Sequence, residues 1–172
     1  MNNILIQGEP GVGKTTLLCT IADSISNRRI GGFFTREIRE KGVRVGFMID
    51  TYDNQSGTLS HIAYTTGPRV GKYRVDVSAF EKIGVQALKK ALEEADVILI
   101  DEIGKMELYS EKFKEAVLRC LDSPKQLVAT VMSRSYPFVD QIKVRQDVEL
   151  MRVTFENRNS IADQLIRKIT AF

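Results

Sequence analysis

The segment GEPGVGKTT, Gly8 to Thr16, directly follows the apolar run Ile4-Leu5-Ile6 and is the most informative part of the chain about its fold. The short apolar run predicts a buried strand over 3–7, and the glycines permit the sharp turn that must follow it. From Lys14 to about Asn27, apolar residues recur at helical spacing: Leu17, Leu18, Ile21, Ala22 and Ile25. The N-terminal segment is therefore predicted to be a strand, a glycine-rich loop and a helix.

The glycine-rich loop fits the P-loop (Walker A) pattern G-x-x-x-x-G-K-[ST] at Gly8, Gly13, Lys14 and Thr15. Glycines let backbone N–H groups approach phosphate oxygens, and the helix N-terminus adds a favourable potential for an anion. We expect Lys14 to reach the β- and γ-phosphates and the Thr15 hydroxyl to ligate Mg²⁺. An ordinary turn could carry these letters by chance, but the required strand and helix flank them. The expected phosphate contacts are Gly8, Glu9, Pro10, Gly11, Val12, Gly13, Lys14, Thr15 and Thr16.

A second motif, VILIDEIGKMEL, spans Val97 to Leu108. Its continuous apolar run predicts a strand buried on both faces of a parallel sheet, which puts Asp101 at the carboxyl end, where such sheets bind ligands. Asp101 is then expected to hold Mg²⁺ through a water, opposite Thr15. Glu102 is the candidate base that aims a water at the γ-phosphorus, which favours hydrolysis over transfer to an organic acceptor. The alternative for Glu102 is a solvated loop charge or a helix-capping partner.

Other candidate residues follow the predicted strands at the same edge. Arg134, after the strand Leu127 to Met132, is proposed to stabilise charge on the transferred phosphoryl group, with Arg36, Arg39, Arg145 and Arg158 as rivals. Lys105 could lean over the phosphates, although a surface lysine is the commoner outcome. Three aromatic residues could stack on a base, although aromatics are more often in the core: Tyr52, Phe138 and Phe155.

The rest of the chain alternates predicted strands and helices. Residues of about 31–77 read as antiparallel β-hairpins that reach over one end of the sheet, because alternating apolar residues are separated by glycine-containing turns. Ser78 and Glu81 have capping-box spacing ahead of a helix to Glu94, and Ser110 is a plausible N-cap of the next helix. A strand over 148–155 and a helix over 160–169 close the chain. The pattern predicts one α/β domain over 1–172, three-layered, with a mainly parallel sheet and helices on both faces.

Composition excludes several classes of function. The net charge of +3, from 25 basic and 22 acidic residues, is small and evenly spread, so no nucleic-acid partner is expected. Cys19 and Cys120 lie in helical apolar patterns without a CxxC pair, and His61 is the single histidine, so a zinc site is not expected. The apolar run at residues 3–6 is too short for a signal peptide or a membrane span. These features predict a cytoplasmic protein.

With these motifs in place, the chain resembles the P-loop family of small, broad-specificity nucleoside-triphosphatases of thermophilic microbes, which has a human cancer-related relative. The resemblance covers nearly the full length and rests on GEPGVGKTT, GGFFTREIRE, RVGFMIDT, VGKYRVDVSAF, VILIDEIGKMEL and FENRN. It implies a RecA-like sheet and Mg²⁺-dependent hydrolysis of the terminal phosphate of several nucleoside triphosphates. It also implies nucleotide contacts along a second segment: Ile98, Leu99, Ile100, Asp101, Glu102, Ile103, Gly104 and Lys105.

The predicted function is therefore Mg²⁺-dependent hydrolysis of ATP, GTP and other nucleoside triphosphates to the diphosphate and phosphate, with Glu102, Lys14 and Arg134 as catalytic residues. Two alternatives stay open. A nucleoside or nucleotide kinase has a similar size and phosphate loop, but the chain shows no clear arginine-rich lid. A nucleotide-gated binding module with slow, incidental hydrolysis would respond to a partner, and the sequence identifies no protein partner.

Overall fold

The computed structural model describes residues 3–25 and 27–171. It contains the predicted strand–loop–helix unit, as strand β1 (Asn3–Gly8) and helix α1 (Lys14–Ser24). The side chains of Leu5 and Ile6 are fully buried, since β1 lies inside the sheet with helices over both faces. Helix α1 ends at Ser24, a few residues earlier than its apolar pattern suggested.

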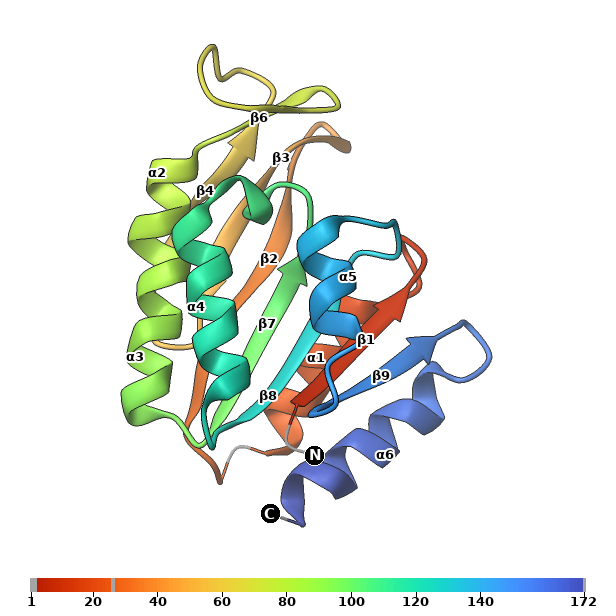
Figure 1. Ribbon diagram of the computed structural model, residues 1–172. Coiled ribbons are helices and arrows are strands. Elements are labelled where there is room, and N and C mark those ends of the chain that lie inside the picture. The colour runs from red at the N-terminus through yellow and green to blue at the C-terminus, as the bar shows by residue number, and fades with distance from the viewer. Residues whose placement is uncertain (1–2, 26, 172) are drawn as a thin grey trace.

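Nine strands form one continuous sheet in the order β5-β6-β4-β3-β2-β7-β8-β1-β9 (Figure 1). Strands β7 (Val97–Ile103), β8 (Gln126–Val131) and β9 (Val148–Val153) match the predicted strands in place and type. The hairpin region supplies the other five: β2 (Ile30–Glu40), β3 (Val43–Thr51), β4 (Ser56–His61), β5 (Arg69–Val70) and β6 (Tyr73–Val75).

The sheet is mixed, so the prediction of a mainly parallel sheet is wrong for the sheet as a whole. Strands β2, β7, β8, β1 and β9 pair in parallel, whereas β2 to β6 pair antiparallel. Strand β2 belongs to both parts: residues 30–33 pair with β7, and its remainder pairs with β3. The two-residue link Lys41-Gly42, with φ of 48° and 80°, forces β3 to run back along β2. The hairpins therefore extend the sheet instead of lying over it.

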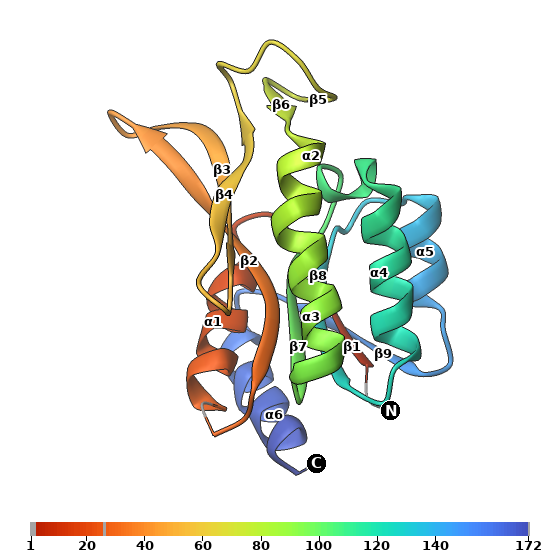
Figure 2. The same ribbon diagram turned by 90° about the vertical axis from the view of Figure 1, so that its left-hand side faces the viewer.

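Helices cover both faces, as predicted (Figure 2). Helices α1 and α6 (Arg158–Thr170) pack on one face through a core that contains Leu18, Ile21 and Leu165. The other face carries α2 (Val77–Phe80), the π-helical turn η1 (Glu81–Val85), α3 (Gln86–Glu94), α4 (Glu111–Asp122) and α5 (Pro137–Lys143). Its core centres on Phe33, Phe80 and Phe113, whose rings contact one another.

Two local details differ from the sequence pattern. Helix α2 begins one residue before the predicted cap, because Asp76 Oδ1 accepts the Ala79 N–H at 2.8 Å in place of a Ser78 cap. Helix α5 was not predicted, since its seven residues are too few for a clear helical period. The predicted cap at Ser110 is confirmed, with its hydroxyl accepting the Phe113 N–H at 3.1 Å.

Candidate functional site

The glycine-rich loop and Asp101 meet at the carboxyl edge of the parallel strands. Strand β8 lies between β1 and β7 and keeps both in register, with Ile6 opposite Thr130 and Ile100 opposite Ala129. Because parallel strands end at the same edge, the loop after β1 and the acidic end of β7 lie on either side of the end of β8. The structure thus brings together the two predicted motifs.

The glycine-rich loop is shaped by its glycines, and the buried side chain of Val12 anchors it in the core. Gly11 and Gly13 have φ of 80° and 99°, in the region that favours glycine, and Gly13 leads directly into α1. A Cβ on Gly8 would lie 2.8 Å from the carbonyl oxygen of Val153, so this strand end tolerates no side chain. The start of α1 has no side-chain cap, and its first N–H groups lack helical partners. This uncapped turn is suited to an anion.

Lys14 lies across the loop that precedes it. Its ammonium group donates hydrogen bonds to the carbonyl oxygens of Gly8 at 2.8 Å and Glu9 at 3.3 Å. The Ser133 hydroxyl donates to the same Gly8 carbonyl at 3.0 Å, which ties the end of β8 to the loop. Full positive charge is therefore held beside the uncapped helix start.

Asp101 is 2% exposed and is surrounded by hydroxyl groups. Thr15 Oγ1 donates to Asp101 Oδ2 at 2.7 Å, and Thr130 Oγ1 donates to Asp101 Oδ1 at 2.7 Å. Thr35 Oγ1, on β2, lies 3.5 Å from Oδ2. A hydroxyl and a carboxylate beside a phosphate loop are the oxygen ligands that Mg²⁺ takes when substrate phosphates complete its shell, so these residues fit the ion. Within the described ranges, no cluster of three or more His, Cys, Asp or Glu could hold a metal unaided.

Two further carboxyl groups lie just beyond Asp101. Burial raises the pKa of Glu102, and the nearby Lys14 charge partly opposes that rise. Burial also raises the pKa of Glu107 to about 8, and the charge of Glu102 adds to the rise. A methyl group on Gly104 would lie 3.1 Å from Glu107 Oε2 and 3.4 Å from the carboxyl carbon of Glu102, so both groups flank one small space. The site holds more carboxyl groups than it holds cations.

Several residues of the second predicted segment cannot contact a nucleotide through their side chains. Ile98, Leu99 and Ile100 are fully buried in the two cores, so the structure contradicts side-chain contacts by these residues. Their apolar packing holds β7 in place and so positions Asp101. Ile103 and Gly104 are also buried, whereas Lys105 is exposed at the same edge.

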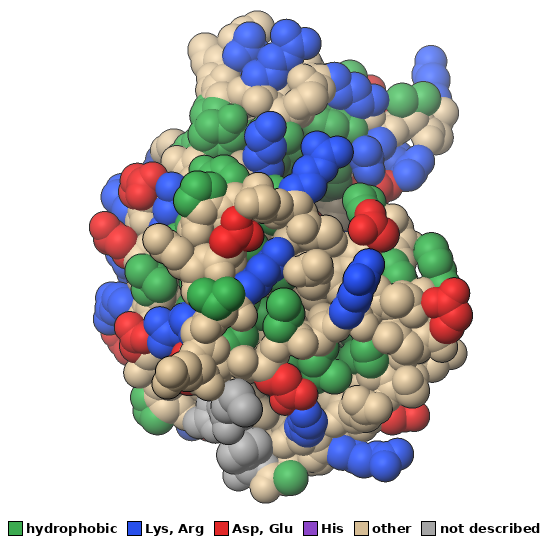
Figure 3. Space-filling model, turned by 45° about the vertical axis from the view of Figure 1, so that its right-hand side comes forward, with side chains coloured by type: hydrophobic (Ala, Val, Ile, Leu, Met, Phe, Trp, Pro, Cys, Tyr) green, Lys and Arg blue, Asp and Glu red, His purple; other side chains and the backbone are tan. Residues whose placement is uncertain are grey.

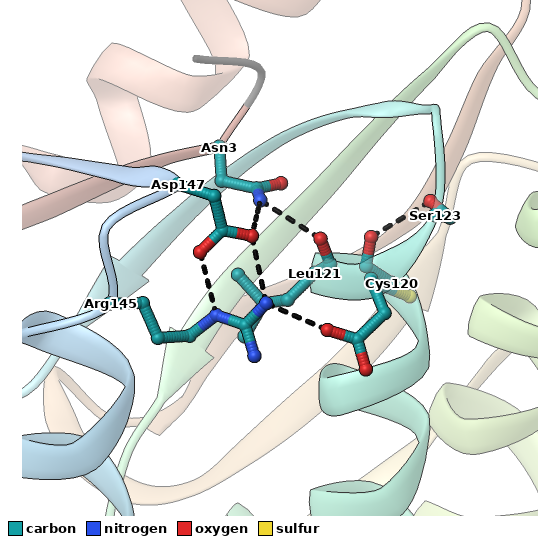
Figure 4. Close-up of polar contacts among 7 residues, drawn as sticks. Asn3, Cys120, Leu121, Ser123, Arg145 and Asp147 are labelled. Carbon is teal, nitrogen blue, oxygen red and sulfur yellow. Dashed lines mark hydrogen bonds and ion pairs between the residues drawn. The ribbon is translucent and has the colours of Figure 1, made fainter.

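The structure separates the arginine candidates. Arg134 is exposed beside the Ser133 contact to the loop, and no bond to another described side chain holds it. Arg36 pairs with Asp50, and Arg39 pairs with Glu37, both on the β2–β3 hairpin. Arg145 is excluded from this site, because it lies at the opposite, amino edge of the sheet. There it binds Asp122 and Asp147, and Asp147 also accepts from the Asn3 side chain (Figure 4).

The three aromatic candidates also differ in position. Tyr52 packs against Phe34 and the core below α1, and burial raises the pKa of its hydroxyl. Phe138 packs against the core beneath α5. Phe155 is 64% exposed, at the β9–α6 connection beside the glycine-rich loop.

Sequence reasoning missed Thr130, Thr35 and Glu107. Thr130 carries a weak signal, since it is a polar residue in the apolar strand LVATV that lies beside the VILID strand. Thr35 carries no such signal, because only the pairing of β2 with β7 brings its side chain close to Asp101. Glu107 reads as an ordinary surface charge, yet it is 5% exposed.

Positive charge gathers above this edge. On the face shown in Figure 3, Lys and Arg side chains concentrate at the upper end, over the β2–β3 hairpin and the connection around β5. The basic residues of these segments are Arg36, Arg39, Lys41, Arg44, Arg69, Lys72 and Arg74. Part of this charge is balanced locally, because Arg36, Arg39 and Arg44 pair with Asp50 or Glu37 of the same hairpin. Among the described helices, none is both long and apolar enough to span a membrane.

Known proteins are similar to this chain in sequence and in fold. A family model described as NTPase matches residues 3–166. Nucleoside-triphosphatase THEP1 of Thermotoga sp. (strain RQ2) is 47% identical over 95% of this chain and 92% of its own length. THEP1 of Methanocaldococcus jannaschii is 41% identical over 98% and 97%, respectively.

Two solved structures superpose over almost the whole chain. The crystal structure of THEP1 from Aquifex aeolicus has a TM-score of 0.89 and 37% identity, covering 97% of this chain and 98% of that one. The solution structure of a human cancer-related nucleoside triphosphatase has a TM-score of 0.85 and 33% identity, covering 99% and 98%. Family model, sequence relatives and solved structures agree, and the chain belongs to the NTPase family.

Proposed function

We propose that this protein hydrolyses the terminal phosphate of nucleoside triphosphates, including ATP and GTP, in a Mg²⁺-dependent reaction of broad base specificity. Family membership supports nucleotide hydrolysis, as the names of the relatives state for those proteins. The observation that carries the proposal is the 2.7 Å hydrogen bond from Thr15 Oγ1 to Asp101 Oδ2, because it joins the phosphate loop to the acidic end of β7.

In this proposal, the backbone N–H groups of the loop bind phosphate oxygens, and Lys14 turns from the loop carbonyls toward the β- and γ-phosphates. Thr15 and Asp101 would hold Mg²⁺, Asp101 through a water, and the ion would supply positive charge to the phosphate oxygens. Thr130 orients Asp101 by donating to its second oxygen.

Glu102 is proposed to accept a proton from the attacking water. The water oxygen bonds to the γ-phosphorus, the bond from that phosphorus to the β,γ-bridging oxygen breaks, and the diphosphate leaves. A buried carboxylate with a raised pKa is a stronger base than a solvated one, which suits this role. Arg134 is still proposed to stabilise the negative charge on the transferred phosphoryl group. Its exposed side chain supports this role, because it lies next to Ser133, which contacts the glycine-rich loop.

We also infer that residues 1–172 form a single P-loop domain of the RecA-like kind. The nine strands share one sheet, and one strand, β8, separates the phosphate-loop strand from the Asp101 strand. The cytoplasmic location and the absence of a nucleic-acid partner stay predictions from composition.

The decisive experiment measures phosphate release from ATP and GTP with Mg²⁺ and without any acceptor, comparing the parent with Lys14→Ala. The parent should produce diphosphate and phosphate. Lys14→Ala should lower kcat by about 10²–10³-fold, because Lys14 charge is needed most as the phosphoryl group leaves, while the loop amides retain nucleotide binding. Turnover only after addition of a nucleoside or its monophosphate would make the protein a kinase. Strong acceleration by RNA, DNA or another protein would favour the gated module.

A further inference from the structure

The position of the proposed γ-phosphate decides where the nucleoside must lie. Lys14, Asp101 and Glu102 lie on the β7 side of the glycine-rich loop. A triphosphate with its terminal group there extends along the loop and the start of α1, so its ribose and base leave on the opposite side. That side is formed by β9, the 154–157 connection and the start of α6.

Two hollows open on this side of the loop. One of about 120 Å³ is lined by Gly8, Val12 and Phe155, and another of about 270 Å³ is lined by Gly13, Thr16 and Arg158. A hollow of about 390 Å³ between β2 and α3 contains none of the predicted phosphate or metal residues. The hollows beside the loop are therefore the ones continuous with the proposed phosphate site.

Phe155 lines the first of these hollows, and Arg158 lines the second. The Phe155 side chain is 64% exposed, although a phenyl ring gains free energy from burial. The Arg158 guanidinium carbon lies 5.7 Å from the centre of that ring, and its Nη1 lies 3.6 Å from where a Cβ on Gly13 would be. A planar cation thus lies over the aromatic ring at the end of the glycine-rich loop.

We infer that Phe155 and Arg158 form the stacking site for the nucleobase, and that this site accepts purines and pyrimidines alike. The inference rests on the proposed triphosphatase function and deepens it. Every base has a π-face, so stacking on Phe155 with the Arg158 plane nearby holds any base without reading its hydrogen-bonding edge. Both side chains are exposed and stand clear of the core, so Arg158 can shift to admit a base. Broad base specificity follows from this arrangement.

The first test compares Phe155→Ala with the control variant Leu150→Ala. Leu150 is also an exposed apolar residue, with 44% of its surface accessible, and it lies nearby in the chain on β9. Binding of Mg²⁺ with ATP, CTP or inorganic tripolyphosphate is measured by calorimetry. Phe155→Ala should weaken ATP and CTP about 5- to 100-fold, the usual worth of one stacked base, and leave tripolyphosphate within about twofold. Leu150→Ala should change none of the three.

The second test uses the fact that the chain contains no tryptophan. Phe155→Trp introduces a single indole, whose fluorescence should be quenched by ATP and CTP through stacking but not by tripolyphosphate. Unchanged ATP and CTP affinity in Phe155→Ala would overturn the inference, and so would an equal loss for tripolyphosphate, which would mean that Phe155 acts on the phosphate loop. If the parent binds tripolyphosphate and ATP equally well, the nucleobase contributes nothing to binding, and the inference of a base site is wrong. If it binds neither, the proposed function itself fails.

Discussion

The two edges of the sheet use the same charged residue types in opposite ways. At the amino edge, Asn3, Asp122, Arg145 and Asp147 form what we term the amino-edge cluster (Figure 4). Arg145 donates to both aspartates, and its guanidinium lowers the pKa of the Asp147 carboxyl. Each carboxylate here has a cationic partner.

At the carboxyl edge, Lys14, Thr15, Asp101, Glu102 and Glu107 form the carboxyl-edge cluster. Its carboxyl groups accept from hydroxyls or lie beside one another, and burial raises the pKa of both glutamates. Lys14 bonds to carbonyl oxygens of the loop and not to a carboxylate. The charges at this edge therefore do not cancel one another within the chain.

The difference separates stability from function. A carboxylate paired with a guanidinium stabilises the fold, whereas a buried carboxyl with a raised pKa destabilises it at neutral pH. Such a cost is retained where a ligand supplies the missing positive charge, as Mg²⁺ would at the carboxyl edge. Substitutions at the amino edge should accordingly change only stability, whereas substitutions at the carboxyl edge should also change catalysis or metal binding.

The largest expected effect is on chemistry at the carboxyl edge. Glu102→Gln keeps size and hydrogen bonding but removes the proposed base, so the chemical step should slow by about 10²–10⁴-fold. Lys14, Thr15, Asp101 and the loop amides are untouched, so nucleotide binding should survive and unhydrolysed triphosphate should accumulate on the protein. Single-turnover hydrolysis measured beside equilibrium binding checks this. A rate within a few-fold of the parent would remove Glu102 from the mechanism, and loss of binding would make it a structural residue.

Asp101→Asn addresses metal binding at the same edge. The amide lacks the negative charge proposed to hold a Mg²⁺-bound water, so the Mg²⁺ concentration for half-maximal rate should rise about 10- to 100-fold. EDTA should abolish activity, and Mg²⁺ or Mn²⁺ should restore it, since both ions prefer oxygen ligands. Titration of the rate with Mg²⁺ is the measurement. An unchanged metal requirement would show that Asp101 is not a metal residue.

Glu107 should set a pH dependence of stability. Its folded pKa of about 8 lies above the ordinary 4.5, so the folded state binds more protons than the unfolded state between those values. Stability should therefore fall as pH rises through this window, by at most about 1.4 kcal/mol per pH unit. Glu107→Gln should flatten this slope. Urea unfolding of metal-free protein from pH 5.5 to 8.5 measures it, and parallel slopes for parent and variant would contradict the raised pKa.

The smallest effect is expected at the amino edge. Arg145→Gln removes the cation that lowers the pKa of Asp147, whose stabilisation is present above the ordinary carboxyl pKa and is lost as pH falls. The pairs are partly exposed, so the free energy of unfolding at pH 7 should drop by only about 0.5–1 kcal/mol. The kcat should not change, because this cluster lies at the opposite edge. Urea unfolding and steady-state rates on one preparation test both parts, and an altered kcat would break the contrast between the edges.

Local patterns in the sequence were sufficient for much of the fold. The strand–loop–helix unit, the buried strand that contains Asp101, the hairpins and the Ser110 cap are confirmed, since each depends on residues close together in the chain. The extent of the antiparallel part was misjudged, because periodicity indicates strands but not their neighbours. Helix α5 was missed because it is short.

The glycine-rich loop, with Lys14 and Thr15 at its end, can be identified in the sequence alone, because its turn and its charges lie within nine consecutive residues. The distant groups that join it become known only from the folded structure. Thr130 and Thr35 reach Asp101 from separate strands, Glu107 is buried beside Glu102, and Arg145 is carried to the far edge. Strand order and burial create these contacts, and both depend on packing between segments far apart in the chain, which no local pattern records.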